Sequence, residues 1–331
     1  MINIYTALFV LIGGASAFAQ VVQESFTPMQ EWESPKSAIM GGVSDCTNIA
    51  PYYEEYLKYA EALSKAVPVT YFTNPTCQTY IKGRIDTSNI RFVDYSLDSI
   101  WIRDYAPIWL KSQKKGTFVL ANFPYGANYF GKRERDDQFS SFLSKALQVP
   151  LVLDFPQKQI QFYFDGGNLM VDDENYCYTA LKNGDDFPPE IRVNLLKQIN
   201  CKDVVFMTPI PQEPTGHVDT FMKFLPKKIV LLARYSLSPF REAMEANKKL
   251  LSDRGFQVIE IDHIDLKDHT SWSYLNSVIV GDNAFVPQYG FDTDAAAVTT
   301  FQNLGFTVHP IQAEQIMREH GSLHCITNFV Y

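Results

Sequence analysis

The stretch IVLLARYSLSPFREAMEANKKLLSDRGFQVIEI, from Ile229 to Ile261, contains the three elements that decide the fold. Ile229–Tyr235 and Phe256–Ile261 are two short apolar runs of the kind that form buried strands. Between them, Pro239–Leu251 repeats apolar residues at the spacing of one helix face. Gly255 stands where a helix C-terminal cap is expected. The stretch therefore predicts strand, helix and strand, which is the pattern of an α/β protein.

The same pattern recurs along the chain. Further amphipathic helices are predicted at Pro51–Ala66, Asp136–Leu147, Pro189–Ile199 and Asp294–Leu304. After the first interval, which carries an insertion around Cys77 to Asn89, the helices begin about 50–55 residues apart, a period typical of structural repeats. An apolar strand follows each helix, at Val67–Phe72, Val149–Phe155, Asp203–Pro209, Phe256–Ile261 and Phe306–Pro310. A strand also precedes the helix in several copies, as at Phe118–Phe123, Ile229–Tyr235 and Ala284–Tyr289.

A second segment that mixes polar and apolar residues follows each of these strands. These segments are Trp101–Leu110, Phe162–Val171, His217–Leu225, Tyr274–Asp282 and Leu323–Tyr331. We interpret the repeat as a strand–helix–strand–strand unit, and five such units arranged radially would form a five-bladed α/β propeller. Any α/β protein alternates helices and strands, so the interpretation depends on the regular spacing and on the matched position of the polar segments.

The polar residues of the second segments predict one shared site. They read WIRDYAP at 101–107, DGGN at 165–168, GHVD at 216–219, SYLN at 273–276 and GSLHCIT at 321–327. A single Asp-Gly-Gly-Asn is more often a turn, and a single His-x-Asp is more often a structural hydrogen bond. Polar groups inside an apolar context are costly unless they are paired. Five such groups at equivalent places therefore indicate convergence at the axis.

The residue types in these segments suggest a reaction. Cys325 with His217 suits nucleophilic catalysis with a proton-shuttling partner. His217 and Asp219 are two positions apart, so on a strand they would project to the same face. Asp104 or Asp219 would accept paired N–H donors from a planar guanidinium. We therefore expect a cationic guanidino substrate.

The segments resemble agmatine deiminases and the bacterial, Porphyromonas-type peptidylarginine deiminases of the guanidino-group modifying superfamily. The matching motifs span Trp101 to Thr327 and are Trp101-x-Arg103-Asp104-x-x-Pro107, Gly166-Gly167-Asn168, Gly216-His217-x-Asp219, Tyr274-x-Asn276 with Pro287-x-Tyr289-Gly290, and His324-Cys325-Ile326-Thr327. The resemblance implies the five-bladed α/β propeller known as the pentein fold. It also implies hydrolysis of a guanidino group to a ureido group and ammonia, with no metal and no cofactor.

The resemblance also implies roles for individual residues. Cys325 is the expected nucleophile, His217 the general acid and base, and Asp104 and Asp219 the carboxylates that hold the guanidinium. Asp165, Asn168 and Asn276 are expected among the substrate-binding residues.

The sequence departs from the family pattern in two places. Asp165 stands where agmatine deiminases usually have Glu, and Gly321-Ser322 replaces a glycine-rich triplet. These departures leave the substrate open between peptidyl-arginine, agmatine and free arginine.

Trp101 and His324 lie within the same motifs as the expected catalytic residues. Trp101 would either line the site, with its ring in cation–π contact with the guanidinium, or belong to the core. His324 is adjacent to Cys325, so on a strand it would point to the opposite face and have no catalytic role.

A basic stretch, Lys132 to Arg135, enters the second predicted helix. Arg133 and Arg135 would form a cationic rim for the carboxylate of a C-terminal arginine. The alternative is a solvated basic loop, since charged loops are usually simply exposed.

The N-terminus predicts export. Residues 1–19 have an apolar run followed by Ala17-Phe18-Ala19, the small-x-small pattern of a signal peptide, and residues 20–331 would form a single catalytic domain. In a secreted or periplasmic protein, cysteines tend to pair. We expect disulfides Cys46–Cys77 and Cys177–Cys201, with Cys325 left as the reactive thiol, although connectivity cannot be read from sequence.

Charge and composition exclude some partners. The net charge is −8 without a basic run, so neither nucleic acid nor an anionic membrane is an expected partner. Export away from polyamine synthesis makes arginine in peptides the first expected substrate and agmatine the second. Two alternatives remain: an amidinotransferase of the same fold, and an inactive arginine-binding module.

Overall fold

The computed structural model describes residues 26–42, 46, 50–114, 116–125, 133–154, 163–182, 188–266 and 269–331. The expected signal peptide at 1–19 and Lys132 lie outside these residues. Within the described part, no helix has both the length and the apolar character needed to cross a membrane.

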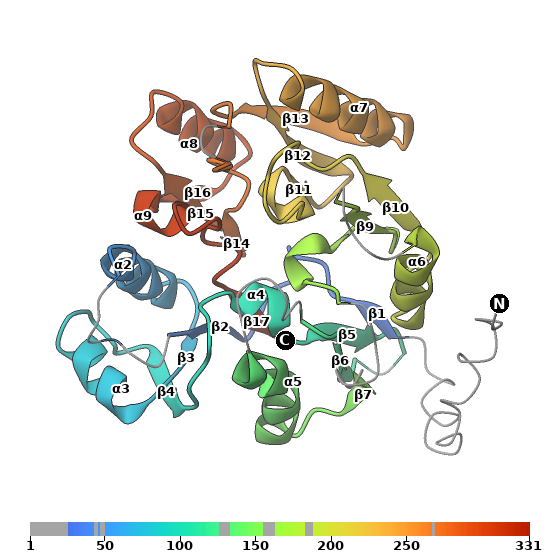
Figure 1. Ribbon diagram of the computed structural model, residues 1–331. Coiled ribbons are helices and arrows are strands. Elements are labelled where there is room, and N and C mark those ends of the chain that lie inside the picture. The colour runs from blue at the N-terminus through green and yellow to red at the C-terminus, as the bar shows by residue number, and fades with distance from the viewer. Residues whose placement is uncertain are drawn as a thin grey trace, which may run out of the picture.

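The strands of the described residues form five separate, open sheets (Figure 1). In order across each sheet they are β1 (Phe26–Pro28), β5 (Ile108–Ser112), β6 (Phe118–Asn122) and β7 (Leu151–Asp154); β8 (Met170–Val171), β9 (Cys177–Ala180) and β10 (Val204–Met207); β11 (Met222–Leu225), β12 (Ile229–Arg234) and β13 (Gln257–Asp262); β14 (Val278–Val280), β15 (Asn283–Gln288) and β16 (Thr307–Gln312); and β17 (Asn328–Val330), β2 (Ser37–Gly41), β3 (Val69–Thr73) and β4 (Ile90–Asp94). The expected mixed α/β fold is confirmed.

One order of pairing is shared by the five sheets. In the third sheet, β11 pairs antiparallel with β12, and β12 pairs in parallel with β13 after the chain has passed through a helix. The same antiparallel and then parallel pairing occurs in the other four sheets. The expected grouping was therefore wrong in one respect: each polar segment begins the next sheet instead of ending its own unit. For the first four segments the physical reason is that a short connection lets the segment pair with the strand that follows, whereas the fifth pairs with β2.

The fifth sheet joins the two ends of the described chain. β17 pairs antiparallel with β2, with Asn328 opposite Ile39 and Val330 opposite Ser37. This sheet therefore forms only when residues near the C-terminus meet residues near the N-terminus. Figure 1 shows β17 and β2 close together beside the short helix α4.

The main helices lie at the periphery in Figure 1, outside the sheets. The helices of the described residues are α2 (Tyr53–Ser64), α3 (Pro75–Lys82), α4 (Ile102–Tyr105), α5 (Glu134–Leu147), α6 (Pro189–Gln198), α7 (Phe240–Asp253), α8 (Asp294–Asn303) and α9 (Glu314–Met317). The five repeated helices α2, α5, α6, α7 and α8 confirm the predictions within three residues at each end. In α7 the apolar stripe includes Phe240, Met244 and Leu251, which are buried, and Gly255 follows the helix at a φ of +84°. Such a φ favours glycine.

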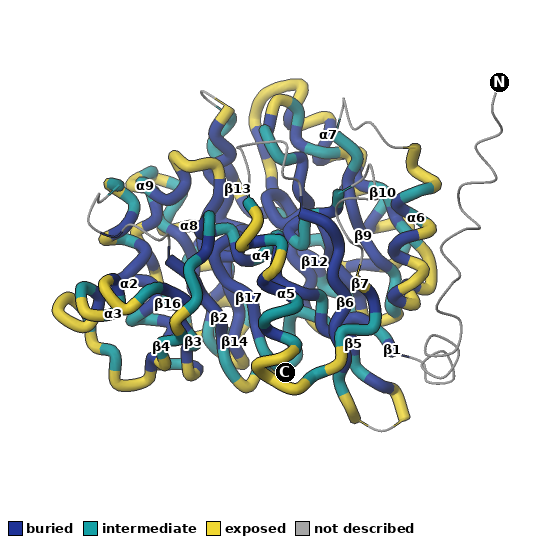
Figure 2. Tube along the Cα trace, turned by 60° about the horizontal axis from the view of Figure 1, so that its bottom comes forward, coloured by how far each residue is buried: buried dark blue, intermediate teal, exposed yellow. Residues whose placement is uncertain are grey.

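Buried residues fill the centre, as Figure 2 shows, and exposed residues gather on loops and the outer turns of helices. Two disulfides reinforce this packing. Cys46 is bonded to Cys77 of α3, and Cys177 of β9 is bonded to Cys201 between α6 and β10. Both expected pairings are confirmed, and Cys325 is the one free cysteine of the five.

Candidate active site

Short helical turns carry the polar residues that begin each sheet. Asp104 lies on α4, Gly167 on the 3-10 turn η3 (Gly166–Asn168), and Asp219 on the 3-10 turn η4 (Val218–Thr220). α4 contacts η3, and η3 contacts η4. The expectation that His217 and Asp219 share a strand face was therefore wrong, because the chain forms a turn there. Gly216, at a φ of +69°, begins that turn, and left-handed backbone of this kind favours glycine.

Gly167 marks the point where three functional groups converge. A Cβ at this position would lie 2.7 Å from Asp104 Oδ1, 2.8 Å from His217 Nδ1 and 3.0 Å from Asp219 Oδ2. Its backbone N–H donates to Asp104 Oδ1 at 3.0 Å. Only a residue without a side chain allows this approach, so the structure brings together three of the expected catalytic residues around Gly167.

The fourth, Cys325, lies against the same group. Its side chain is buried, and Sγ lies 3.1 Å from Asn276 Nδ2 and 3.6 Å from Asp219 Oδ2. Asn276 Oδ1 accepts hydrogen bonds from the backbone N–H groups of Cys325, Ser322 and His324. Asn276 thus fixes both the sulfur and the backbone of the turn that carries it.

Burial, followed by the negative charges of Asp219 and Asp104, raises the pKa of the Cys325 thiol well above its usual value. Without a ligand the sulfur is therefore a neutral thiol at neutral pH. A cation bound between the carboxylates and the sulfur would oppose this shift, because an opposite charge nearby favours the ionised form.

His217 is surrounded by acids. Its Nε2 lies 3.2 Å from Asp165 Oδ2, and its Nδ1 lies 3.7 Å from Asp104 Oδ1. Burial alone would lower the pKa of His217, but Asp104, Asp165 and Asp219 outweigh it and raise that pKa to about 10. The imidazole is therefore protonated at neutral pH and able to donate a proton.

Asp104 and Asp219 differ in their environments. Burial, with Asp165 and Asp219 nearby, raises the pKa of Asp104 to about 7 against the opposing effect of His217. Burial also opposes ionisation of Asp219, but His324, His217 and Arg103 hold its pKa below the usual value. Asp219 is therefore the more securely ionised of the two carboxylates.

One oxygen of Asp219 lacks a partner. Oδ2 accepts from His324 Nδ1 at 2.8 Å, whereas Oδ1 is buried and no donor among the described residues reaches it. A buried carboxylate oxygen without a donor is costly. A ligand N–H group at this position would satisfy it.

Trp101 and Asn168 are two further residues that the sequence placed at the site. Trp101 lies beside the turn that leads to Cys325, since a Cβ on Gly321 would lie 2.3 Å from its ring. Asn168 does not face the site as expected: its Nδ2 and Oδ1 bond the carbonyl and the N–H of Ala180 in β9, both at 2.9 Å. We correct its role from substrate contact to support of η3.

Arg133 and Arg135 bind different partners. Arg135 forms an ion pair with Asp98 and donates to it again through its backbone, so the expected substrate contact is replaced by a scaffold contact. Arg133 donates to the hydroxyl of Tyr125. Burial, followed by the charges of Asp104 and Asp165, raises the pKa of Tyr125 well above its usual value, which indicates that Tyr125 and Arg133 adjoin the site.

Three charged residues near the site had no signal in the sequence: Lys223 and Glu213, which are buried, and Glu31, which is partly buried. Glu31 and Lys223 form an ion pair at 3.0 Å, and Glu31 also contacts His324. Glu213 accepts from the backbone of Thr215 and Gly216, which supports the turn before His217. Glu31 lies far along the chain from both partners, so no local pattern could have identified it. No cluster suited to a metal ion occurs among the residues that the structure describes.

Comparisons with known proteins agree with this geometry. The sequence model of the Porphyromonas-type peptidyl-arginine deiminase family matches residues 28–330. Agmatine deiminase of Pseudomonas aeruginosa is 24% identical over 327 residues, covering 84% of this chain and 86% of that protein.

Two solved structures share the fold. Agmatine deiminase of Enterococcus faecalis superposes with a TM-score of 0.81 at 21% identity, covering 93% of this chain and 96% of the other. A cysteine-to-serine variant of C. jejuni agmatine deiminase with substrate bound gives a TM-score of 0.80 at 18% identity, covering 92% and 96%.

Proposed function

Because this chain belongs to the Porphyromonas-type peptidyl-arginine deiminase family, we propose that it hydrolyses a guanidinium group to a ureido group and ammonia. The observation that carries the proposal is Asp219, which places Oδ2 3.6 Å from the Cys325 sulfur while its buried Oδ1 has no donor among the described residues. A guanidinium bound there would satisfy Oδ1 and bring its carbon toward the thiol.

Binding comes first in the proposed reaction. A guanidinium has several N–H donors in one plane, and carboxylates accept them in pairs. Asp219 and Asp104 supply the acceptors, and the positive charge of the substrate offsets their mutual repulsion. The same charge favours ionisation of the Cys325 thiol, which is the form that attacks carbon.

The chemical steps then balance as follows. The Cys325 thiol releases its proton to solvent, and Sγ bonds to the guanidinium carbon while the carbon–nitrogen double-bond electrons move to nitrogen. His217 protonates one nitrogen, and the bond from carbon to that nitrogen breaks to release ammonia. His217 next takes a proton from water, whose oxygen bonds to the same carbon as a hydroxyl group. The carbon–sulfur bond then breaks as the carbonyl forms, and the hydroxyl proton passes to the sulfur, which leaves the ureido product and the Cys325 thiol. A proton-shuttling side chain of this kind contributes roughly 10²–10⁴-fold in rate.

Ammonia release tests the proposal. The purified protein should release ammonia from at least one of agmatine, free arginine, and peptides with internal or C-terminal arginine. Adding an amine acceptor should not divert the product to a new guanidino compound; such transfer would identify an amidinotransferase. Binding of these compounds without any turnover would identify an arginine-binding module.

For the substrate, we infer arginine in peptides, converted to citrulline, ahead of agmatine. The support is Arg133, which bonds the hydroxyl of Tyr125 beside Asp104 and Asp165. A cation there suits the carboxylate of a C-terminal arginine, which agmatine lacks. Arg133→Ala should lower kcat/KM for a peptide ending in arginine and leave agmatine turnover unchanged. Arg135→Ala is the matched control, because Asp98 already holds that side chain.

We propose that residues 1–19 direct export of the protein. Export supports the same substrate, arginine in peptides. The disulfides Cys46–Cys77 and Cys177–Cys201 favour an oxidising compartment. The N-terminus of the exported protein, determined by peptide sequencing, should be Gln20. An unprocessed protein retained in the cytoplasm would contradict the assignment and favour agmatine.

For the architecture, we propose that the five sheets are the blades of a five-bladed α/β propeller with the site at its axis. The support is the shared strand order and the pairing of β17 with β2, which joins the last sheet to the first residues. In a closed ring the sheet formed by both chain ends is part of the fold. Deleting residues 328–331 should therefore prevent folding instead of merely fraying one edge.

A further inference from the structure

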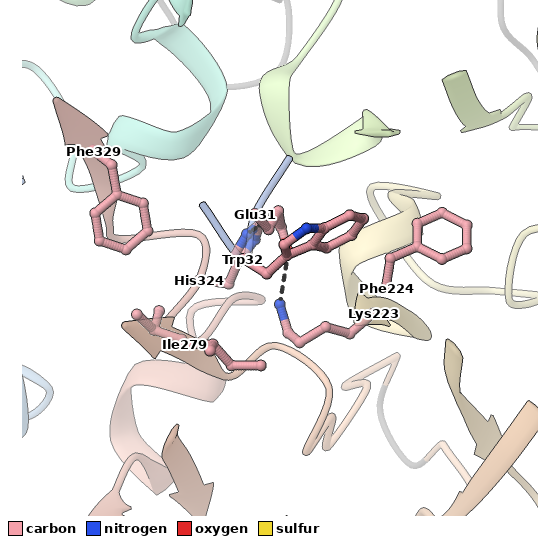
Figure 3. Close-up of a pocket in the computed structure, with 8 residues that line it drawn as sticks. Glu31, Trp32, Lys223, Phe224, Ile279, His324 and Phe329 are labelled. Carbon is pink, nitrogen blue, oxygen red and sulfur yellow. Dashed lines mark hydrogen bonds and ion pairs between the residues drawn. The ribbon is translucent and has the colours of Figure 1, made fainter. Parts of the chain in front are cut away.

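A row of four polar side chains, three of them buried and Glu31 partly buried, leads from Asp219 to the N-terminal segment after β1. His324 Nδ1 lies 2.8 Å from Asp219 Oδ2, and His324 Nε2 lies 2.5 Å from Glu31 Oε1. Glu31 Oε2 in turn lies 3.0 Å from Lys223 Nζ on β11. Figure 3 shows Lys223 extending toward the carboxylate of Glu31, with His324 beside it.

This row of side chains has little contact with solvent. The side chains of His324 and Lys223 are 3% and 2% exposed, and that of Glu31 is 21% exposed. Buried ion pairs contribute little net stability, because removing both charges from water costs about as much as their attraction returns. Stability alone therefore gives a weak reason for placing four charged groups in a row behind the site.

The donor and acceptor roles of these side chains show how His324 links Glu31 to Asp219. Both ring nitrogens of His324 face carboxylate oxygens, and an ionised carboxylate can only accept. The two bonds together therefore need a proton on each nitrogen. Burial opposes ionisation of Glu31, but His324, Lys223 and Arg103 hold its pKa well below the usual value. An ionised Glu31 can only accept, so its bond to His324 requires an N–H at Nε2.

We propose that Glu31 is a positioning residue for the reaction, acting through His324 to orient Asp219 and keep it ionised. The inference rests on the proposed function, since its purpose is to leave Asp219 Oδ1 available to the guanidinium. His324 occupies Oδ2, so the carboxylate cannot rotate without losing a charge-assisted bond. The sequence had indicated no catalytic role for His324 from strand geometry, but it lies on a turn.

Glu31→Gln tests the proposal, with Glu33→Gln as the matched control. Glu33 lies in the same segment and pairs with Lys111 at 2.8 Å, where the lysine side chain is 45% exposed. Glu31→Gln should lower kcat/KM by about tenfold or more at neutral pH, in line with the loss of a hydrogen bond to a charged group. Glu33→Gln should retain the wild-type value.

The pH profile separates positioning from loss of structure. Asp219 is faced by His324, His217, Arg103, Asp104 and Cys325, and only the state of His324 should change in Glu31→Gln. Less positive charge beside Asp219 lets it protonate more readily, so the pH midpoint of its carboxyl ¹³C NMR signal should move to higher pH. This signal reports Asp219 itself, whereas the acid limb of kcat/KM also reflects Asp104. Glu31→Asp, which retains the charge, should restore the midpoint. An unmoved midpoint in Glu31→Gln, with or without a lower Tm, would overturn the proposal.

A measurement without substrate keeps the proposal distinct from the proposed function. In ¹⁵N NMR, both ring nitrogens of wild-type His324 should show protonated shifts at pH 7, and Glu31→Gln should change them. If the wild-type protein turned over no guanidino compound, the proposed function would fail, while this result would still support the link from Glu31 to Asp219. A singly protonated His324 in the wild-type protein would refute the link. This measurement uses the wild-type protein alone, so it does not depend on whether any variant folds.

Discussion

The sulfur of Cys325 lies 3.6 Å from Oδ2 of Asp219, although the two residues are 106 positions apart in the chain. A carboxylate so near a thiol disfavours the thiolate in the empty site. A guanidinium between them would favour it. Cys325 is therefore expected to become reactive mainly when substrate is present, which would protect its thiol from oxidation.

Replacing Cys325 by serine should abolish turnover. The loss should be at least about 10³-fold, because removing a nucleophile eliminates the covalent step. The substitution changes one atom, so the Tm should stay within about 2 °C of the wild-type value. Ammonia assays and thermal melts measure the two effects. Measurable turnover in this variant would assign the nucleophile to another residue.

The thiol should titrate above the ~8.5 of free cysteine. Alkylation of Cys325 by iodoacetamide, followed against pH without substrate, reports the midpoint. Because Asp219 contributes to raising this pKa, Asp219→Asn should move the midpoint to lower pH. Burial slows alkylation at every pH but does not shift the midpoint between variants. A midpoint near 8.5 in the wild-type protein would contradict the assigned environment.

Asp104→Asn should lose activity without losing stability. Burial raises the folded-state pKa of Asp104 to about 7. Its contribution to the free energy of unfolding is therefore fully present below the unfolded pKa of about 4 and is lost as the pH rises through 7. Asparagine has no such loss, so at pH 8 the variant should be at least as stable as the wild-type protein. Its kcat/KM should fall by about 100-fold, because a charged acceptor becomes neutral.

Denaturant unfolding at pH 5 and pH 8 compares the two proteins. The stability gain of Asp104→Asn should appear at pH 8 and disappear at pH 5. Near-normal kcat/KM would reassign Asp104 to the scaffold.

Gly167→Ala should inactivate the site by crowding it. The added methyl group would lie within 3.0 Å of Asp104, His217 and Asp219. At least one of these side chains must move, and we expect kcat to fall by about 100-fold, as for displacements of about 1 Å in other active sites. Gly83→Ala is the control, since its Cβ would be 3.6 Å from the nearest atom. Equal activity in both variants would argue against convergence at Gly167.

Both disulfides should be present in the protein purified without reductant. Non-reducing peptide mapping should identify Cys46–Cys77 and Cys177–Cys201 and leave Cys325 alone with a free thiol. The bridged residues are 31 and 24 positions apart, so each bridge should add about 3 kcal/mol to the free energy of unfolding by restricting the unfolded chain. Reduction before denaturant unfolding tests the magnitude. Five free thiols would refute the pairing.

The helices were predictable because their signal is local. α5 and α8 begin within two residues of their predicted starts. The residues that form an amphipathic pattern lie in adjacent turns of the same helix, so the pattern can be recognised in the sequence. The sequence also predicted that Cys325, His217, Asp104 and Asp219 share one site, and the fold brings them together. Each lies in a motif of a few residues. The contacts of Asn168 and Arg135 were not predictable. Their partners, Ala180 and Asp98, are set by how neighbouring segments pack.

By itself, the sequence determined the repeated helices, the cysteine left outside the disulfides and the acidic character of the site. These features depend on residue type and short spacing. Only the tertiary structure decided that the polar segments are turns beginning the next sheet, and that Glu31 reaches Asp219 through His324. Glu31 and His324 are 293 positions apart. The physical reason is that such contacts form only when distant segments pack together, and only then, against the opposing effect of burial, do His324 and Lys223 hold the pKa of Glu31 low.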